Sequence, residues 1–134
     1  MSAPLEIVSQ WVEKAEHDLR NAEHTLTLQE DCPFDTVCYH AQQCAEKYLK
    51  AFLISKSQDF PRTHDLRLLL QLALAVSAIE LQMAEVTALN RYAVEARYPG
   101  DWEPFTRAEA EEAVVTARKV KKGIREHLPP DCVG

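Results

Sequence analysis

Apolar residues recur at alternating steps of three and four along two long stretches of the chain, and this spacing constrains the fold more than any other feature. The first stretch, residues 5–28, has them at Leu5, Val8, Val12, Ala15, Leu19, Ala22 and Leu26. The second has them at Ala110, Ala113, Ala117, Val120, Ile124 and Leu128. Such steps place side chains on one stripe of an α-helix. Each stretch is therefore predicted to be an amphipathic helix that needs partners for its apolar stripe.

A third stretch, from Pro33 to about residue 56, carries apolar side chains on so many sides that we expect it to be the central helix. Proline suits the first turn of a helix, where its missing N–H group is no loss, so Pro33 is predicted to start it. The apolar residues here are Val37, Cys38, Ala41, Cys44, Ala45, Tyr48, Leu49, Phe52 and Leu53. A helix with so little polar surface has to pack against neighbours on more than one side.

Two further helices are expected between the central helix and the last one. Thr63 is a candidate cap for a leucine-dense helix over residues 64–75, whose leucines cannot all be exposed. Ser77 and Glu80 have the spacing of a capping box, in which each side chain bonds the other residue's backbone N–H. This spacing predicts a fourth helix over residues 77–97.

The final helix carries the clearest start signal. Thr106 and Glu109 again have capping-box spacing, immediately before the second periodic stretch. The whole pattern predicts an all-α fold, an antiparallel bundle of about five helices. We expect residues 1–134 to form a single domain, with residues 128–134 as a loose tail.

Composition narrows the classes of function. The chain has 15 basic and 21 acidic side chains, a formal net charge of −6, so a generic coat for nucleic-acid backbones is disfavoured and DNA is an improbable partner. We expect no signal peptide, and the sequence has no run of about 18 apolar residues that would span a membrane. No CxxC pair occurs among the four cysteines, which favours reduced thiols and a cytoplasmic location; they are Cys32, Cys38, Cys44 and Cys132.

Three stretches, taken in order, resemble the HEPN family, which is named for higher eukaryotes and prokaryotes and for nucleotide binding. The first is a helix-1 pattern made of Trp11, Ala15, Asp18, Leu19 and Ala22. The second, and most specific, is the run YHAQQCAEKYLKA over residues 39–51, followed by Thr63-His64-Asp65-Leu66. The third is Arg97-Tyr98-Pro99. The resemblance covers nearly the whole chain. It implies a bundle of about five helices, a homodimer, and a partnership with a small nucleotidyltransferase or a toxin–antitoxin setting.

The resemblance also raises the question of catalysis. Many HEPN proteins are metal-independent ribonucleases that use an arginine followed, after four to six residues, by a histidine. The arginine holds the scissile phosphate and the histidine moves a proton near neutral pH. No arginine of this chain has a histidine at that distance, because Arg20–His24 and Arg62–His64 are both too closely spaced.

The nearest approach to that motif is the segment from Arg91 to Tyr98. Arg91 and Tyr98 fit the ends of an Arg-x4-His-x-Tyr form, but Ala96 then stands where the histidine would be. If the chain is active, the candidate catalytic residues are Arg91, Arg97, Tyr98 and, from outside the segment, His64. The alternative interpretation, which we favour, is a structural network of ion pairs and hydrogen bonds near the end of a helix.

The central helix carries polar residues as well. His40, Gln43, Lys47 and Lys50 share one face of it, which fits either a solvated stripe or a surface for a phosphate or an acidic partner. His64 is either part of a helix start or a ligand-binding group near Lys47. His40 and Cys44 are spaced like one metal-binding pair, but no second pair accompanies them, so we expect no metal and no cofactor.

We therefore predict a non-catalytic HEPN-like module that acts by dimerisation and by association with a nucleotidyltransferase, a nucleotide or an RNA. Any such ligand is expected to contact Lys47, His64, Arg91 or Arg97. The alternative is a HEPN ribonuclease toxin of a toxin–antitoxin pair with an atypical active site, and a third alternative is a plain helical adaptor. The basic residues near the end of the last helix have a simpler explanation, because cations there complement the helix dipole.

Overall fold

A computed structural model describes residues 5–93 and 104–132, and these are helical with no strand. The three long helices are α1 (Leu5–Leu26), α2 (Phe34–Ser55) and α5 (Arg107–Arg125). The shorter elements are α3 (Leu66–Val76), α4 (Met83–Thr87) and two 3₁₀ turns, η1 (Ala88–Tyr92) and η2 (Pro130–Cys132). The prediction of an all-α bundle is thus confirmed. No helix within the described part of the chain is long and apolar enough to cross a membrane.

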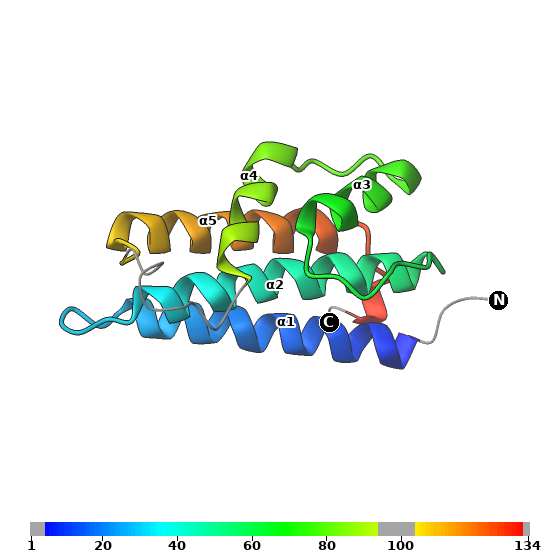
Figure 1. Ribbon diagram of the computed structural model, residues 1–134. Coiled ribbons are helices and arrows are strands. Elements are labelled where there is room, and N and C mark those ends of the chain that lie inside the picture. The colour runs from blue at the N-terminus through cyan, green and yellow to red at the C-terminus, as the bar shows by residue number, and fades with distance from the viewer. Residues whose placement is uncertain (1–4, 94–103, 133–134) are drawn as a thin grey trace.

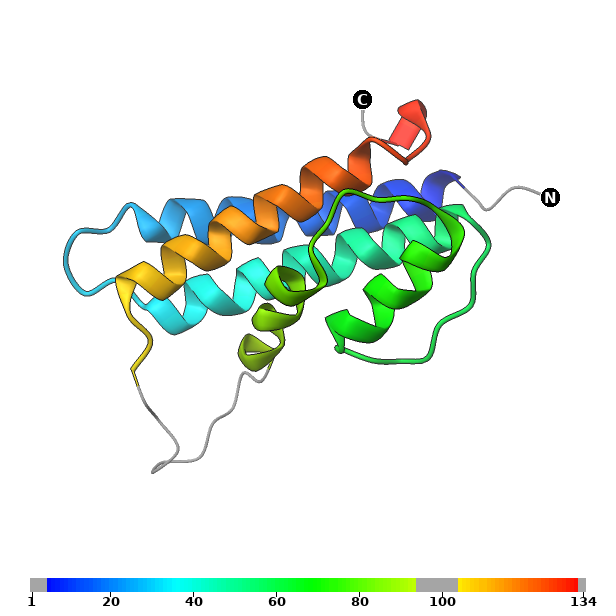
Figure 2. The ribbon, with the colours of Figure 1, turned by 90° about the horizontal axis from the view of Figure 1, so that it is seen from above.

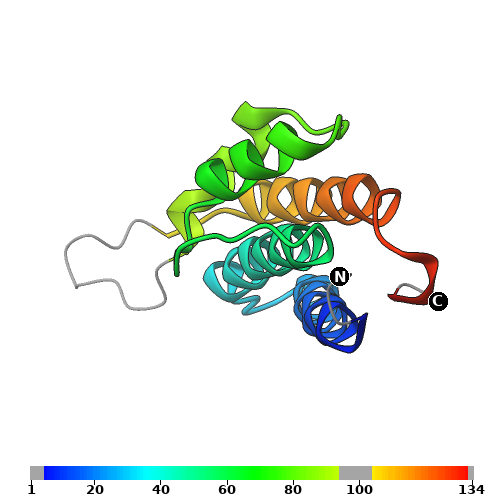
Figure 3. The same cartoon turned by 90° about the vertical axis from the view of Figure 1, so that its right-hand side faces the viewer.

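The long helices lie side by side, with α2 between α1 and α5 (Figure 1). The α1–α2 pair is antiparallel, whereas α5 runs in the same direction as α2 (Figures 1 and 2). The starts of α2 and α5 meet at one end of the bundle, where the Arg107 guanidinium lies 5.0 Å from the centre of the Phe34 ring. The α3 and α4 helices cover the side of the bundle formed by α2 and α5 (Figure 3).

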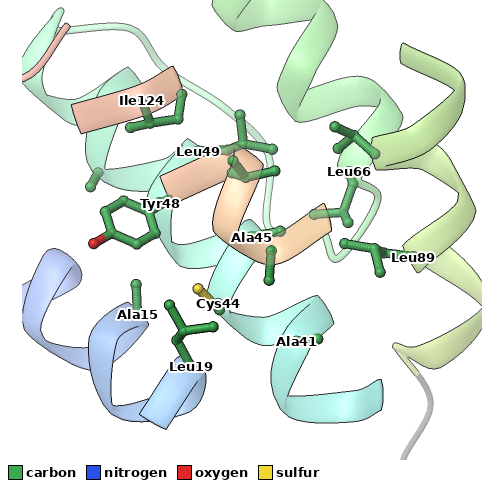
Figure 4. Packing of buried hydrophobic residues seen from close by; sticks show 14 of the residues in the cluster. Ala15, Leu19, Ala41, Cys44, Ala45, Tyr48, Leu49, Leu66, Leu89 and Ile124 are labelled. Atoms are coloured by element: carbon green, nitrogen blue, oxygen red, sulfur yellow. The ribbon is translucent and has the colours of Figure 1, made fainter. Parts of the chain in front are cut away.

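The central position predicted for α2 is confirmed. It contacts α1, α3, α5 and η1, and its large apolar side chains are fully buried: Val37, Tyr48, Leu49, Phe52 and Leu53. Cys44 of α2 faces Leu19 of α1, and Leu66 and Leu89 meet on another side of α2 (Figure 4). Burial of a side chain of this size contributes about 1.5–3 kcal/mol, so α2 holds the bundle together.

Two helix starts differ from the prediction. The N-cap of α3 is Asp65, whose Oδ1 accepts a hydrogen bond from the Arg67 backbone N–H at 3.0 Å. Thr63 instead accepts a bond from the backbone N–H of Asp65, so it shapes the turn that precedes the helix. The carboxylate of Asp65 lies beside a free backbone N–H group in the first turn of α3, and it therefore makes the cap.

The predicted capping box of Ser77 and Glu80 does not form. Ser77 ends α3, its N–H donating to the carbonyl of Ala73, and its backbone is extended. The chain then crosses α5, where a Cβ on Gly123 would lie 3.2 Å from the Leu81 side chain. Because Leu81 packs against α5 at this point, the next helix, α4, begins only at Met83. It is followed directly by η1. The last residues of the expected helix, 94–97, lie outside the described residues.

The end of the chain also differs from the loose tail that we expected from residue 128. Leu128 and Cys132 are both 7% exposed, and the intervening chain forms η2, which packs on α1. The Cys132 Sγ lies 3.7 Å from the carbonyl oxygen of Leu5. The capping box of Thr106 and Glu109 at the start of α5, by contrast, is present as predicted. Residues 128–132 are therefore part of the packed domain.

Leu69→Ala is expected to lower the free energy of unfolding by about 2–5 kcal/mol, because Leu69 is fully buried in the core. The matched control is Leu74→Ala in the same helix, where the side chain is 37% exposed and the loss should stay below about 1 kcal/mol. Urea unfolding measures both. Equal losses for the two variants would contradict the orientation of α3.

Candidate functional site

The middle of α2 carries a buried carboxylate, Glu46, whose side chain is only 4% exposed. Its Oε1 accepts hydrogen bonds from the His64 Nδ1 at 2.9 Å and from the Gln42 side-chain amide at 3.2 Å. Its Oε2 accepts one from the Lys50 amine at 3.0 Å. The Gln43 amide lies at 3.5 Å from Oε1 and also bonds Gln42. Gln43 and Lys50 of the polar face predicted on α2 thus belong to a buried hydrogen-bond network.

This network decides the charge of Glu46. Burial alone would raise the pKa of the Glu46 carboxyl group, but the hydrogen bonds from Lys50, His64 and Gln42 outweigh burial and hold it below its ordinary value of 4.5. Glu46 is therefore ionised at neutral pH. A buried anion is stable only when its oxygens are fully paired, and here the pairing comes from one lysine, one histidine and two amides.

Asp18 of α1 is the centre of a second cluster. It is 7% exposed; its Oδ1 lies 2.7 Å from the His40 Nδ1 and its Oδ2 lies 2.5 Å from the Lys47 amine. Lys47, predicted as a ligand-binding residue, is therefore engaged in an ion pair within the bundle. The cluster joins the helix-1 stretch of the family resemblance to the α2 stretch.

Arg91 lies in η1 and is also paired. Its Nη2 donates to the Tyr92 hydroxyl at 2.7 Å and lies 3.2 Å from the Oε2 of Glu109 on α5. The hydrogen bond with Tyr92 raises the pKa of Arg91 above its ordinary value. Burial raises the pKa of Tyr92 to about 12, which makes it a poor proton donor near neutral pH. The Arg91 side chain is still 58% exposed. Arg97 and Tyr98 lie outside the described residues.

Asn90 connects the surroundings of His64 and Arg91. Its Oδ1 accepts a hydrogen bond from the Leu66 backbone N–H, and its Nδ2 donates to the Oδ1 of Asp65, both at 2.8 Å. Because Asn90 directly precedes Arg91, and Asp65 directly follows His64, the two predicted site residues belong to segments in direct contact. The sequence offered no signal for Asn90, since a single asparagine has no periodicity or partner spacing.

Four basic residues of α5 have partners as well. Carboxylates on α1 bind Arg118 through Glu23 at 2.6 Å and Lys121 through Glu16 at 2.9 Å. Tyr48 of α2 donates a hydrogen bond to Glu16 and accepts one from Arg125 at 3.1 Å. Lys119 binds a carboxylate of α4. These cations thus join α5 to its neighbours.

Cys38 and Cys44 give little support for a nucleophilic or metal site. Burial raises the pKa of Cys38 to about 12 and raises that of Cys44 further, so neither is a thiolate near neutral pH. Within residues 5–93 and 104–132, no three histidine, cysteine, aspartate or glutamate side chains converge as metal ligands would. His40, the proposed partner of Cys44, binds Asp18 instead.

Glu46→Gln is expected to lower the free energy of unfolding by about 1–3 kcal/mol at neutral pH, because a charged acceptor of buried hydrogen bonds is lost. The ionic part of this difference is present above the ordinary glutamate pKa, and it disappears as the pH falls through the lowered pKa of folded Glu46. Urea unfolding across acidic pH measures this. Glu13→Gln is the control, since the Glu13 side chain is 66% exposed. A difference between wild type and Glu46→Gln that does not shrink in acid would contradict the pairing.

The chain is similar to two solved helical structures. One is TT1696 from Thermus thermophilus, at 30% identity and a TM-score of 0.72, covering 90% of this chain and 98% of that chain. The other is ST0689, described as an archaeal HEPN homologue, at 23% identity and a TM-score of 0.69, covering 89% of this chain and 95% of that chain. No curated protein matches the sequence.

The HEPN domain pattern matches residues 8–127. This match runs from α1 to the end of α5, and so includes Asp18, Glu46, His64 and Arg91. It agrees with the resemblance that the sequence carries in the same stretches. The chain belongs to the HEPN domain family.

Proposed function

We propose that this chain is a non-catalytic HEPN module that acts by dimerisation and by association with a partner. The partner classes are a nucleotidyltransferase, a nucleotide and an RNA. The observation that carries the proposal is the pairing of the charged residues: Lys47, Lys50 and Arg91 each bind a carboxylate of the same chain. Paired residues such as these are not available to activate a substrate without breaking those contacts.

The groups of the candidate site that could act as acids or bases support the same proposal. A general acid or base needs a pKa near the working pH, and the Tyr92 hydroxyl, with a pKa of about 12, is far from it. The sequence has no histidine at the motif distance from Arg91. The exposed side chain of Arg91 can still contact an anion, as can that of His64, which is 70% exposed. We assign the ligand-contacting roles to these two, with Lys47 and Arg97 as the further candidates.

A second candidate function, a ribonuclease with an atypical active site, has one observation in its favour. The hydrogen bond between Asn90 and Asp65 brings the chain around Arg91 next to the chain around His64. An arginine for the phosphate and a histidine for the proton would then come from two segments. The side chains, however, are directed to different partners, Arg91 to Glu109 and His64 to Glu46.

The isolated protein is expected not to cleave RNA at a rate typical of HEPN ribonucleases, because a positioned histidine contributes about 10²–10⁴-fold to such chemistry. The measurement is incubation with structured and with single-stranded RNA in EDTA. Arg91→Ala and His64→Ala test the second candidate, and Arg20→Ala, which removes an exposed arginine of α1, serves as control. Robust cleavage that both test variants abolish, and the control does not, would replace the proposal with the ribonuclease.

The protein is expected to be a homodimer. Packing within the chain buries Leu66, Leu69 and Leu70. Leu74 and Val76 on α3 nevertheless remain 37% and 40% exposed, and pairing of two copies would cover apolar surface of this kind. Light scattering at micromolar concentration should give about twice the chain mass of 15.2 kDa. A mass equal to that of one chain would reject the dimer.

A further inference from the structure

His64 is the exposed end of the hydrogen-bond network that starts at the buried Glu46. Its side chain is 70% exposed, whereas that of Glu46 is 4% exposed. The segment that carries it is held at three points: the His64 carbonyl accepts from Gln42 at 3.3 Å, its Nδ1 bonds Glu46 at 2.9 Å, and the next residue is bonded by Asn90. The imidazole is therefore an exposed group on a fixed backbone, with one of its two nitrogens already engaged.

The chemistry of Glu46 decides which nitrogen of His64 carries the proton. An ionised carboxylate can only accept hydrogen bonds, and the pairing with Lys50, Gln42 and His64 keeps Glu46 ionised. The Nδ1 of His64 must therefore be the donor in every protonation state of the ring. In the neutral ring the Nε2 atom then carries a lone pair, and in the protonated ring the same atom carries an N–H group.

We propose that His64 is a proton-gated contact for an oxyanion of the phosphate type. The protonated ring offers a charged Nε2–H donor to the anion, whereas the neutral ring presents a lone pair that repels it. This inference rests on the proposed association with a nucleotide or an RNA, and it adds that the association is pH-dependent through one residue. Most of the other cations described above are already paired with carboxylates, so one added positive charge matters here.

The charges around His64 come from three elements. From α2, Glu46 and Lys50 form a pair that cancels. On the segment of His64 itself, Asp65 is engaged as the cap of α3 and by Asn90. From η1, Arg91 follows Asn90 and is 58% exposed, although it shares its charge with Glu109. Protonation of His64 thus adds one positive charge to this set of groups.

Sulfate titration followed by NMR tests the gate, because sulfate keeps its double charge throughout the range in which histidines titrate, about pH 5 to 8. Binding near His64 should be about tenfold tighter at the acidic end, the size of one charged hydrogen bond. His64→Asn should remove this pH dependence. His17→Asn, which changes a half-exposed histidine paired with Glu13 on α1, should leave it intact. Binding of equal strength at both ends of the range, or an unchanged pH dependence in His64→Asn, would overturn the proposal.

A second readout does not depend on a ligand. Long-range ¹H–¹⁵N spectra at the alkaline end of the range should show His64 with the proton on Nδ1, and the Glu46→Gln variant should lose that preference. A proton on Nε2 in the wild type would overturn the proposal even if sulfate binds. Adenosine monophosphate, titrated in parallel, separates this inference from the proposed function. Sulfate gating without any AMP binding would refute nucleotide association alone, whereas AMP binding that is unchanged in His64→Asn would refute the gate alone.

Discussion

The burial of α2 is the constraint on which the rest of the structure depends. A helix enclosed by α1, α3, α5 and η1 can keep a polar side chain only if a neighbour supplies a partner, since an unpaired buried charge is too costly. Glu46 shows the consequence most clearly, because its partners come from α2 itself and from the segment before α3. The requirement to satisfy one buried carboxylate therefore sets the position of a segment eighteen residues further along the chain.

This constraint gives a structural role to the residues that carry the family resemblance. Asp18 on α1 binds His40 and Lys47 on α2. A residue of the first stretch of the resemblance thus binds residues of the second stretch. The His64-Asp65 pair supplies a partner for Glu46 and a cap for α3. These contacts explain why such residues occur together in a HEPN domain that lacks the arginine–histidine spacing of a ribonuclease. His64 and Arg91 each combine a polar contact with a side chain that is mostly exposed, and ligand binding is proposed at these two residues.

The helices that pack along their whole length were predictable from the sequence, because a helix that is buried along one side has apolar residues at regular steps. The helix starts that were predicted wrongly depend on contacts between distant segments. Thr63 and Asp65 are both residue types that cap helices, and in the structure Asp65 makes the cap and is also bonded by Asn90. Ser77 has the right spacing for a cap, but packing of the following chain against Gly123 takes precedence. The candidate site was predicted in part: His64 and Arg91 were named from the sequence, whereas the roles of Glu46 and Asn90 follow from tertiary contacts alone.

The central claim is that the charged residues of α1 and α2 in the stretches that carry the resemblance hold the bundle together by binding one another. A double-mutant cycle on the free energy of unfolding tests it directly, with Asp18→Asn, Lys47→Met and the double variant. The account predicts a coupling energy of about 1 kcal/mol or more for this largely buried pair. The exposed pair Glu23–Arg118 is the reference, and about 0.5 kcal/mol or less is expected for it. A coupling between Asp18 and Lys47 no larger than that of the reference pair would contradict the account.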